Sequence, residues 1–154
     1  MKLRDYTKRE LVFVFGEQCD KRPFLQRLVR MVKGQLPDID DASLLERLYA
    51  REEQVTTGIG HGVAIPHAIV DGLDRTRCVV VQIPGGIDYE SLDSSPVHVA
   101  FLLLSPPGVT GVHIRLLARI ARLVDSGELV SDMARADGAD AVYQVLMEQD
   151  ASHV

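Results

Sequence analysis

His67 is the residue of this sequence best suited to covalent chemistry. It ends a segment, residues 56–67, in which glycine recurs at alternate positions before a Pro-His pair. Glycine permits tight turns and close approach of other groups, while Pro66 fixes its own φ and favours extended geometry at Ile65. The segment therefore predicts a stiff backbone that presents His67 at a strand end. A neutral imidazole there can act as a nucleophile and carry a phosphoryl group. The alternative interpretation of His67 is a structural or solvated histidine.

The glycines do not match a nucleotide-binding loop. Their spacing differs from GxGxxG, no Lys-Ser or Lys-Thr pair follows, and Pro66 prevents a helix from starting in the register that cradles a pyrophosphate. We therefore expect no dinucleotide or P-loop site. As backbone, the glycines are expected to form a turn that fixes the residues after it.

Two further residues, His113 and Arg51, are candidates for holding an anion. His113 falls in the first turn of a predicted helix, where free N–H groups and the dipole favour an anion and disfavour imidazolium, although an ordinary first-turn residue fits equally. Arg51 lies late in another predicted helix. Its guanidinium fork suits phosphate oxygens, but a solvated or helix C-terminal charge is the commoner role. The charged run 47–53 is otherwise expected to be a solvated face.

The remaining histidines and both cysteines form no recognisable metal or redox motif. No HxxxH, HxH or CxxC spacing is present, so a zinc site would have to be assembled by the fold alone. His98 lies in a predicted strand as a surface or packed residue, and His153 lies in an expected frayed tail. Cys19 and Cys78 are expected to be free thiols. We expect neither a metal nor a cofactor.

Strand and helix patterns alternate around these candidates. β-branched and aromatic runs predict strands at residues 11–15, 78–83 and 97–104, and a short apolar strand follows the glycines. Apolar residues spaced three or four apart predict helices at residues 24–36, 43–53, 112–126, 128–136 and 139–148. Asp40 and Asp41 are natural N-caps for the second helix. The interleaving predicts an α/β fold with helices on the faces of a mostly buried sheet.

Length, charge and composition exclude several classes of protein. The 154 residues suit one domain, which we expect to span residues 1–154. With 17 Lys and Arg against 22 Asp and Glu, the net charge is -5, and no basic stripe indicates nucleic acid. No apolar run approaches the roughly 20 residues that cross a bilayer, and the first residues lack the apolar core of a secretory signal. We therefore expect a cytoplasmic protein with no nucleic-acid partner and no membrane insertion.

Residues 57–67, with the sequence TGIGHGVAIPH, closely resemble the phosphorylation-site segment of the fructose, mannitol and nitrogen-regulatory enzyme IIA family (type 2) of the bacterial phosphotransferase system. Residues 113–123 are similar to the second-histidine helix of that family. Residues 44–52 place Arg51 at the spacing that the family uses. The likeness covers essentially the whole chain.

This resemblance implies a mixed, about five-stranded sheet with helices on both faces. It also implies a phosphoryl-accepting His67, an assisting His113 and a phosphate-binding Arg51, with a histidine-containing phosphocarrier protein as donor. A chain of this length looks most like the nitrogen-regulatory branch, in which regulatory target proteins read the phosphorylation state. The alternative is a sugar-uptake IIA subunit that passes the phosphoryl group to a IIB protein for fructose- or mannitol-type transport.

Overall fold

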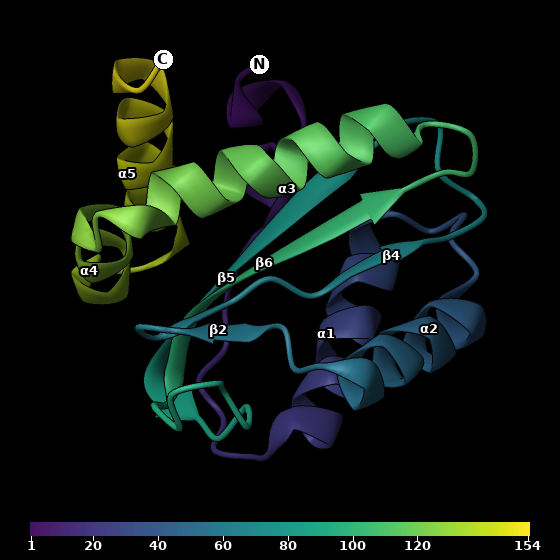
Figure 1. Ribbon diagram of the computed structural model, residues 1–154, viewed down its shortest axis with the longest axis horizontal. Helices are drawn as coiled ribbons and strands as arrows, with labels where there is room; N and C mark the ends of the chain where they lie inside the picture. Colours follow the sequence, from purple (N-terminus) through teal and green to yellow (C-terminus); the bar gives the residue numbers. More distant parts are fainter.

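A mixed β-sheet lies between two layers of helices in the computed structural model, which describes residues 1–154 (Figure 1). The β-branched runs form three strands: β1 (Val12–Val14), β5 (Arg77–Ile87) and β6 (Val97–Ser105). The glycine-rich segment supplies three short ones: β2 (Gly58–Gly60), β3 (Val63–Ala64) and β4 (His67–Ile69). The sheet thus has six strands, one more than the family resemblance implies, because this segment is divided into separate pieces.

The glycines allow the chain to reverse between β2 and β3. Gly60 and Gly62 have φ of 97° and 83°, which side chains other than glycine rarely adopt. A Cβ at Gly58 would lie 2.6 Å from the Ser91 hydroxyl oxygen, so this position needs glycine for a different reason. The predicted turn is confirmed, and it forms a tight hairpin immediately before the histidine.

The strand order is β1-β5-β6-β3-β2, and β4 also pairs with β6. β5 is antiparallel to β6, whereas β3 and β4 both run parallel to it. Val63 lies opposite Val99 and His67 lies opposite Leu103, so β3 and β4 keep one register. They are two parts of a single line of chain interrupted before His67, where Pro66 has no N–H to donate.

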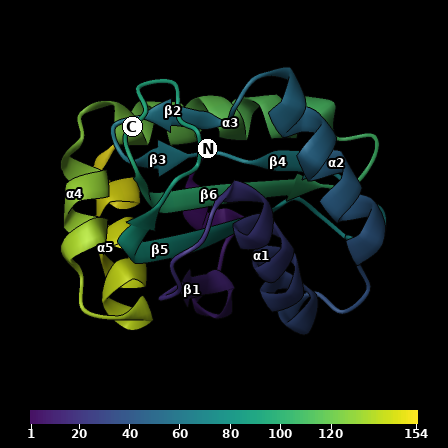
Figure 2. The same ribbon diagram turned by 90° about the horizontal axis from the view of Figure 1, so that it is seen from below.

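Five α-helices cover the sheet, α1 and α2 on one face and α3 to α5 on the other. Their bounds are α1 (Lys21–Gln35), α2 (Asp41–Gln54), α3 (Thr110–Asp125), α4 (Glu128–Arg135) and α5 (Ala139–Ser152), and two 3-10 turns, Leu3–Asp5 and Arg9–Leu11, precede β1. Figure 2, seen from below, shows α1 and α2 in front of the sheet and α4 and α5 at one end of it. All predicted helices are present, with ends displaced by no more than about one turn. Asp40 is the N-cap of α2, because its carboxylate accepts from the Ser43 N–H at 3.1 Å.

The alternation of side chains along a strand directs His67 toward α3. Ala64 and Ala68 belong to the apolar cluster on the α1 and α2 side, and Val63 and Ile65 belong to the cluster on the α3 side. His67 continues the second series. Its ring accordingly lies beside the ring of His113 in α3.

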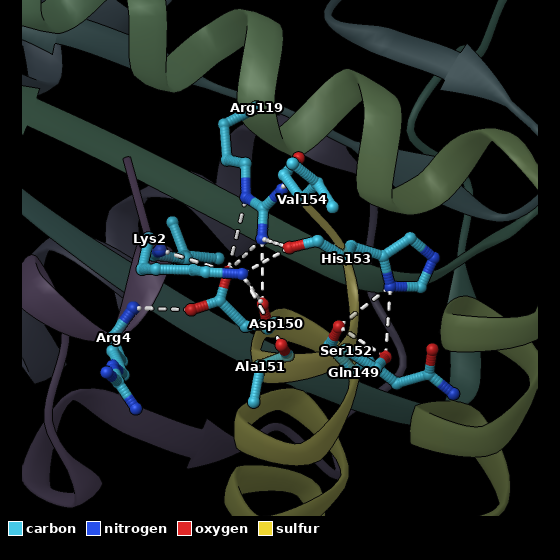
Figure 3. A network of polar contacts seen from close by, with 10 residues as sticks. Lys2, Arg4, Arg119, Gln149, Asp150, Ala151, Ser152, His153 and Val154 are labelled. Carbon is cyan, nitrogen blue, oxygen red and sulfur yellow. Dashed lines mark hydrogen bonds and ion pairs between the residues drawn. The ribbon is translucent and has the colours of Figure 1, made fainter.

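A buried ion pair joins α3 to both ends of the chain (Figure 3). Arg119 and Asp150 are 1% and 0% exposed, and Arg119 Nη2 lies 2.8 Å from Asp150 Oδ1. The carboxylate also accepts from the backbone N–H groups of Leu3 and Arg4, each at 3.0 Å. Arg119 further donates to the carbonyls of the last α5 turn and of the C-terminal residues: Asp150, His153 and Val154. The prediction of a frayed tail at His153 is therefore wrong, because these hydrogen bonds hold the C-terminal residues in place.

Candidate functional site

His67 opens onto a pocket of about 170 Å³ at the end of α2. The lining residues come from α2, both ends of the glycine-rich segment and α3: Arg51, Thr56, Thr57, Ile59, Ile65, His67 and Leu117. The structure thus brings His67 of β4 and Arg51 of α2 to one cavity. A larger hollow of about 610 Å³ beside Gly85 and Asp88 contains neither of them.

The hydrogen bond of His67 identifies its free ring nitrogen. Its Nδ1 lies 2.9 Å from the Ile65 carbonyl oxygen. A carbonyl only accepts, so Nδ1 carries the proton, and a neutral imidazole then has its lone pair on Nε2. Because the side chain is half-buried, this nitrogen remains within reach of the pocket. The arrangement leaves Nε2 of His67 as the ring nitrogen with a free lone pair.

A buried carboxylate holds the backbone that orients His67. Ile65 donates its N–H to the Thr57 carbonyl at 2.9 Å, and Thr57 donates its own N–H to Glu52 at 2.9 Å. Glu52, with a side chain 5% exposed, also pairs with Lys21 at 3.1 Å. Burial, and after it the Glu52 carboxylate, raises the pKa of Tyr89, whose hydroxyl therefore stays protonated and donates to Glu52 at 3.0 Å.

These contacts correct the prediction of a solvated face at residues 47–53. Glu52 points inward instead, because its carboxylate joins the last turn of α2 to the start of the glycine-rich segment. No motif in the sequence marks this role. The residue would have to be found through its partners, which lie in three other parts of the chain.

His113 lies beside His67 with its ring centroid 5.6 Å away and its plane inclined by 60°. Its side chain is buried, and burial, followed by the proximity of His67, lowers the pKa of His113, so the ring is neutral near physiological pH. His113 Nδ1 lies 2.7 Å from the Ser105 hydroxyl oxygen, which lies 2.9 Å from that of Thr76.

The N-terminus of α3 also supplies hydrogen-bond donors. The helix begins at Thr110, and the His113 N–H is already bonded to the Val109 carbonyl at 3.1 Å. The amides of residues 110–112 precede the first intrahelical bond and have no partner within the helix. The predicted first-turn position of His113 is confirmed, but the free N–H groups belong to the three residues before it.

Arg51 caps the helix in which it lies and also lines the pocket. One guanidinium nitrogen donates to the Val55 carbonyl at 2.9 Å, which caps the C-terminus of α2. The same side chain lines the pocket next to His67. A guanidinium has five N–H donors, and this bond uses one of them, so the group can still bind an anion.

The other candidate groups lie apart from this site. His98 is partly buried in β6, with Nδ1 3.1 Å from the Ile83 carbonyl oxygen, and Cys19 and Cys78 are free thiols. Burial raises the pKa of Cys78 to about 12. No group of three or more His, Cys, Asp or Glu side chains is placed to hold a metal ion. None of the helices has the length and apolar character needed to span a membrane.

Comparison with known proteins places the chain in a family. Residues 5–149 match the family model described as "Phosphoenolpyruvate-dependent sugar phosphotransferase system, EIIA 2". A nitrogen regulatory protein of Pseudomonas aeruginosa is 34% identical over 140 residues, which cover 91% of this chain and 90% of that protein.

Solved structures share the fold. The nitrogen regulatory protein IIA-Ntr of Neisseria meningitidis superposes with a TM-score of 0.81 at 22% identity, covering 92% of this chain and 97% of that one. Enzyme IIAMTL of Escherichia coli, solved in complex with phosphorylated enzyme IIBMTL, gives a TM-score of 0.73 at 16% identity, covering 92% and 99%. The family match spans both the glycine-rich segment and α3, so the chain belongs to the EIIA type 2 family of the phosphoenolpyruvate-dependent sugar phosphotransferase system.

Proposed function

We propose that this protein accepts a phosphoryl group on Nε2 of His67 from a histidine-containing phosphocarrier protein. The observation that carries the proposal is the contact between His67 Nδ1 and the Ile65 carbonyl oxygen at 2.9 Å. It leaves one unprotonated ring nitrogen, on a rigid backbone, next to a pocket that Arg51 also lines. An enzyme IIA component needs an acceptor of this kind.

In the proposed reaction, Nε2 of neutral His67 attacks the phosphorus of a phosphohistidine on the donor. The N–P bond to the donor breaks, and its imidazole leaves with the electron pair of that bond. The phosphorylated ring of His67 keeps its Nδ1 proton, and the hydrogen bond that Nδ1 donates to the Ile65 carbonyl oxygen strengthens as the ring becomes more positive. No metal or cofactor is needed, since an imidazole is itself a good leaving group.

The surroundings of His67 would position the phosphoryl group rather than take part in bond making. His113, the amides of residues 110–112 and Arg51 are the donors for its equatorial oxygens. In phosphoryl transfer, such positioning and charge stabilisation supply most of the rate enhancement. Ile59 and Ile114, which are 41% and 60% exposed, provide an apolar rim on which a protein donor can dock.

We assign a regulatory, nitrogen-type role to the phosphorylated protein. The support is its 34% identity, over nearly the full length of both chains, to a nitrogen regulatory protein. The alternative is transfer to a IIB protein in fructose- or mannitol-type sugar uptake, as suggested by the likeness to a IIA protein solved together with a phosphorylated IIB protein. Retention of the phosphoryl group in the presence of IIB proteins would favour regulation. Rapid loss to one of them would favour transport.

Phosphorylation can be tested with phosphoenolpyruvate, enzyme I and the phosphocarrier protein. The wild type should acquire one acid-labile, base-stable phosphoryl group, and His67→Ala should acquire none while remaining folded. His98→Ala is the matched control, because His98 also has Nδ1 at a backbone carbonyl but lies outside the pocket. Labelling of His67→Ala to the wild-type level would refute the proposal.

A further inference from the structure

Two hydroxyl groups, on Thr76 and Ser105, form a buried chain that ends on His113. Both side chains are buried, at 3% and 0% exposure. They face each other across β5 and β6, one step beyond the Arg77 and Leu104 pair, on the side of the sheet covered by α3. Thr76 Oγ1 lies 2.9 Å from Ser105 Oγ, which lies 2.7 Å from His113 Nδ1, and neither hydroxyl has another hydrogen-bond partner.

Counting donors and acceptors gives the direction of these bonds. If His113 Nδ1 carried a proton, it would donate to Ser105, and one of the two buried hydroxyl protons would be left without an acceptor. If Nδ1 is unprotonated, Thr76 donates to Ser105 and Ser105 donates to His113, so both protons are used. An unsatisfied buried donor is unfavourable, because it loses its hydrogen bond to water without gaining another. The second arrangement is therefore favoured, and it requires the proton of His113 to be on Nε2.

We propose that Thr76 and Ser105 are positioning residues that hold His113 as the Nε2–H tautomer, so that it donates a hydrogen bond to the phosphoryl group on His67. The role in transfer rests on the proposed function, whereas the tautomer does not. The two histidines then have opposite tautomers. His67 has a free lone pair on Nε2, fixed by a carbonyl, and His113 has a free N–H on Nε2, fixed by a hydroxyl.

The opposite tautomers suit the transfer of an anion. An unprotonated Nε2 on His113 would direct a lone pair at the phosphoryl oxygens and repel them. A neutral N–H attracts them without the cost of burying an imidazolium. The hydroxyl chain thus determines whether His113 attracts or repels the phosphoryl group, although it touches neither His67 nor the pocket.

The tautomer can be measured in the unphosphorylated protein by ¹⁵N NMR of its imidazole nitrogens, at a pH well above the ordinary histidine pKa of about 6.5. We expect His113 to show an unprotonated Nδ1 and a protonated Nε2, and His67 to show the reverse. A protonated Nδ1 on His113 would overturn the inference whether or not His67 accepts phosphate. Conversely, phosphorylation of His67→Ala would refute the proposed function and leave the measured tautomer of His113 unaffected.

Variants of the hydroxyl chain test its role. Ser105→Ala leaves His113 Nδ1 without a hydrogen-bond partner, so the two tautomers of His113 should become comparable in population and the transfer rate should fall roughly tenfold. Ser105→Thr keeps the hydroxyl and should retain the wild-type tautomer. Thr76→Val removes only the proton donated to Ser105, and Ser105 can still donate to His113, so the Nε2–H tautomer should persist while the rate falls no more than about twofold. An unchanged tautomer and rate in Ser105→Ala, or a change in Ser105→Thr equal to that in Ser105→Ala, would contradict the positioning role.

Discussion

Helix α3 contributes a buried polar side chain to each of two regions, and the regions differ in how completely their donors and acceptors are used. Around Arg119, the carboxylate of Asp150, two backbone N–H groups and the carbonyls of the C-terminal residues bond one another (Figure 3). Around His113, each of the two histidine rings has one bonded nitrogen and one free nitrogen. Complete pairing stabilises the fold, and incomplete pairing beside a pocket leaves atoms available for chemistry.

The electrostatics of the two regions follow the same division. Burial alone would raise the pKa of Asp150, but hydrogen bonds from the Arg4 amide, Arg119 and the Leu3 amide outweigh it and lower that pKa. Asp150 is therefore ionised, and its carboxylate is hydrogen-bonded to these three partners. Burial of His113 has no such compensation, so its pKa is lowered and the ring stays neutral. One region stabilises a buried charge, and the other keeps His113 uncharged.

The largest expected effect is on stability. Asp150→Ala leaves Arg119 buried without its carboxylate, which should lower the free energy of unfolding by about 3–5 kcal/mol in denaturant titrations. The folded fraction should still accept phosphate at the wild-type rate. Asp140→Ala is the matched control, because its partner Arg9 and Asp140 are 41% and 90% exposed, and stability should hardly change. Asp150→Asn serves if the alanine variant does not fold. A loss of transfer in a fully folded Asp150 variant would show that the two regions are not independent.

His113→Ala should have the converse effect, which is a loss of transfer rate rather than of stability. Removing a hydrogen-bond donor to the phosphoryl group in the transition state should lower the rate of transfer to and from His67 about a hundredfold. His113→Gln keeps an N–H donor and should be milder. Quench-flow kinetics with the phosphorylated carrier protein would measure both rates, and His98→Ala should match the wild type. If the alanine and glutamine variants prove equally harmless, His113 belongs with Arg119 as a structural residue.

Arg51 should have a smaller influence on the same rate. Losing one charged hydrogen bond to a phosphoryl oxygen costs on the order of 2 kcal/mol, so Arg51→Ala should slow acceptance roughly thirtyfold. Arg30→Ala removes the same charge from an exposed position on α1 and should have no effect. A rate for Arg51→Ala within twofold of the wild type would restrict Arg51 to capping α2 through the Val55 carbonyl.

The smallest effect concerns pH. Because the pKa of His113 is lowered in the folded state, the unfolded chain binds a proton more readily than the folded protein does. This contribution is absent well above the ordinary histidine pKa of about 6.5, and it destabilises the fold as the pH drops through that value toward the lower folded pKa. The unfolding free energy of the wild type should therefore fall more steeply with acid than that of His113→Gln. Parallel plots of unfolding free energy against pH for the two proteins would contradict a lowered pKa for His113.

The sequence predicts most elements and the surroundings of His67 only in part. Periodicity predicts all five helices and the long strands, because each has an apolar face that the sheet or a helix layer buries. It does not predict that Pro66 separates β3 from β4, since the interruption depends on pairing with β6. Glu52 could not be placed, because its partners come from three separate segments. Ser105 did offer a signal, as a polar residue on the same strand face as the buried Phe101 and Leu103.

The most direct test of the account is to identify the nitrogen atom that carries the phosphoryl group. In ¹⁵N-labelled protein phosphorylated by the carrier, coupling between ³¹P and the imidazole nitrogens distinguishes Nε2 from Nδ1 and His67 from His113. The account predicts phosphorus on Nε2 of His67, with Nδ1 still protonated and bonded to the Ile65 carbonyl. Phosphorus on Nδ1 of His67, or on either nitrogen of His113, would contradict it.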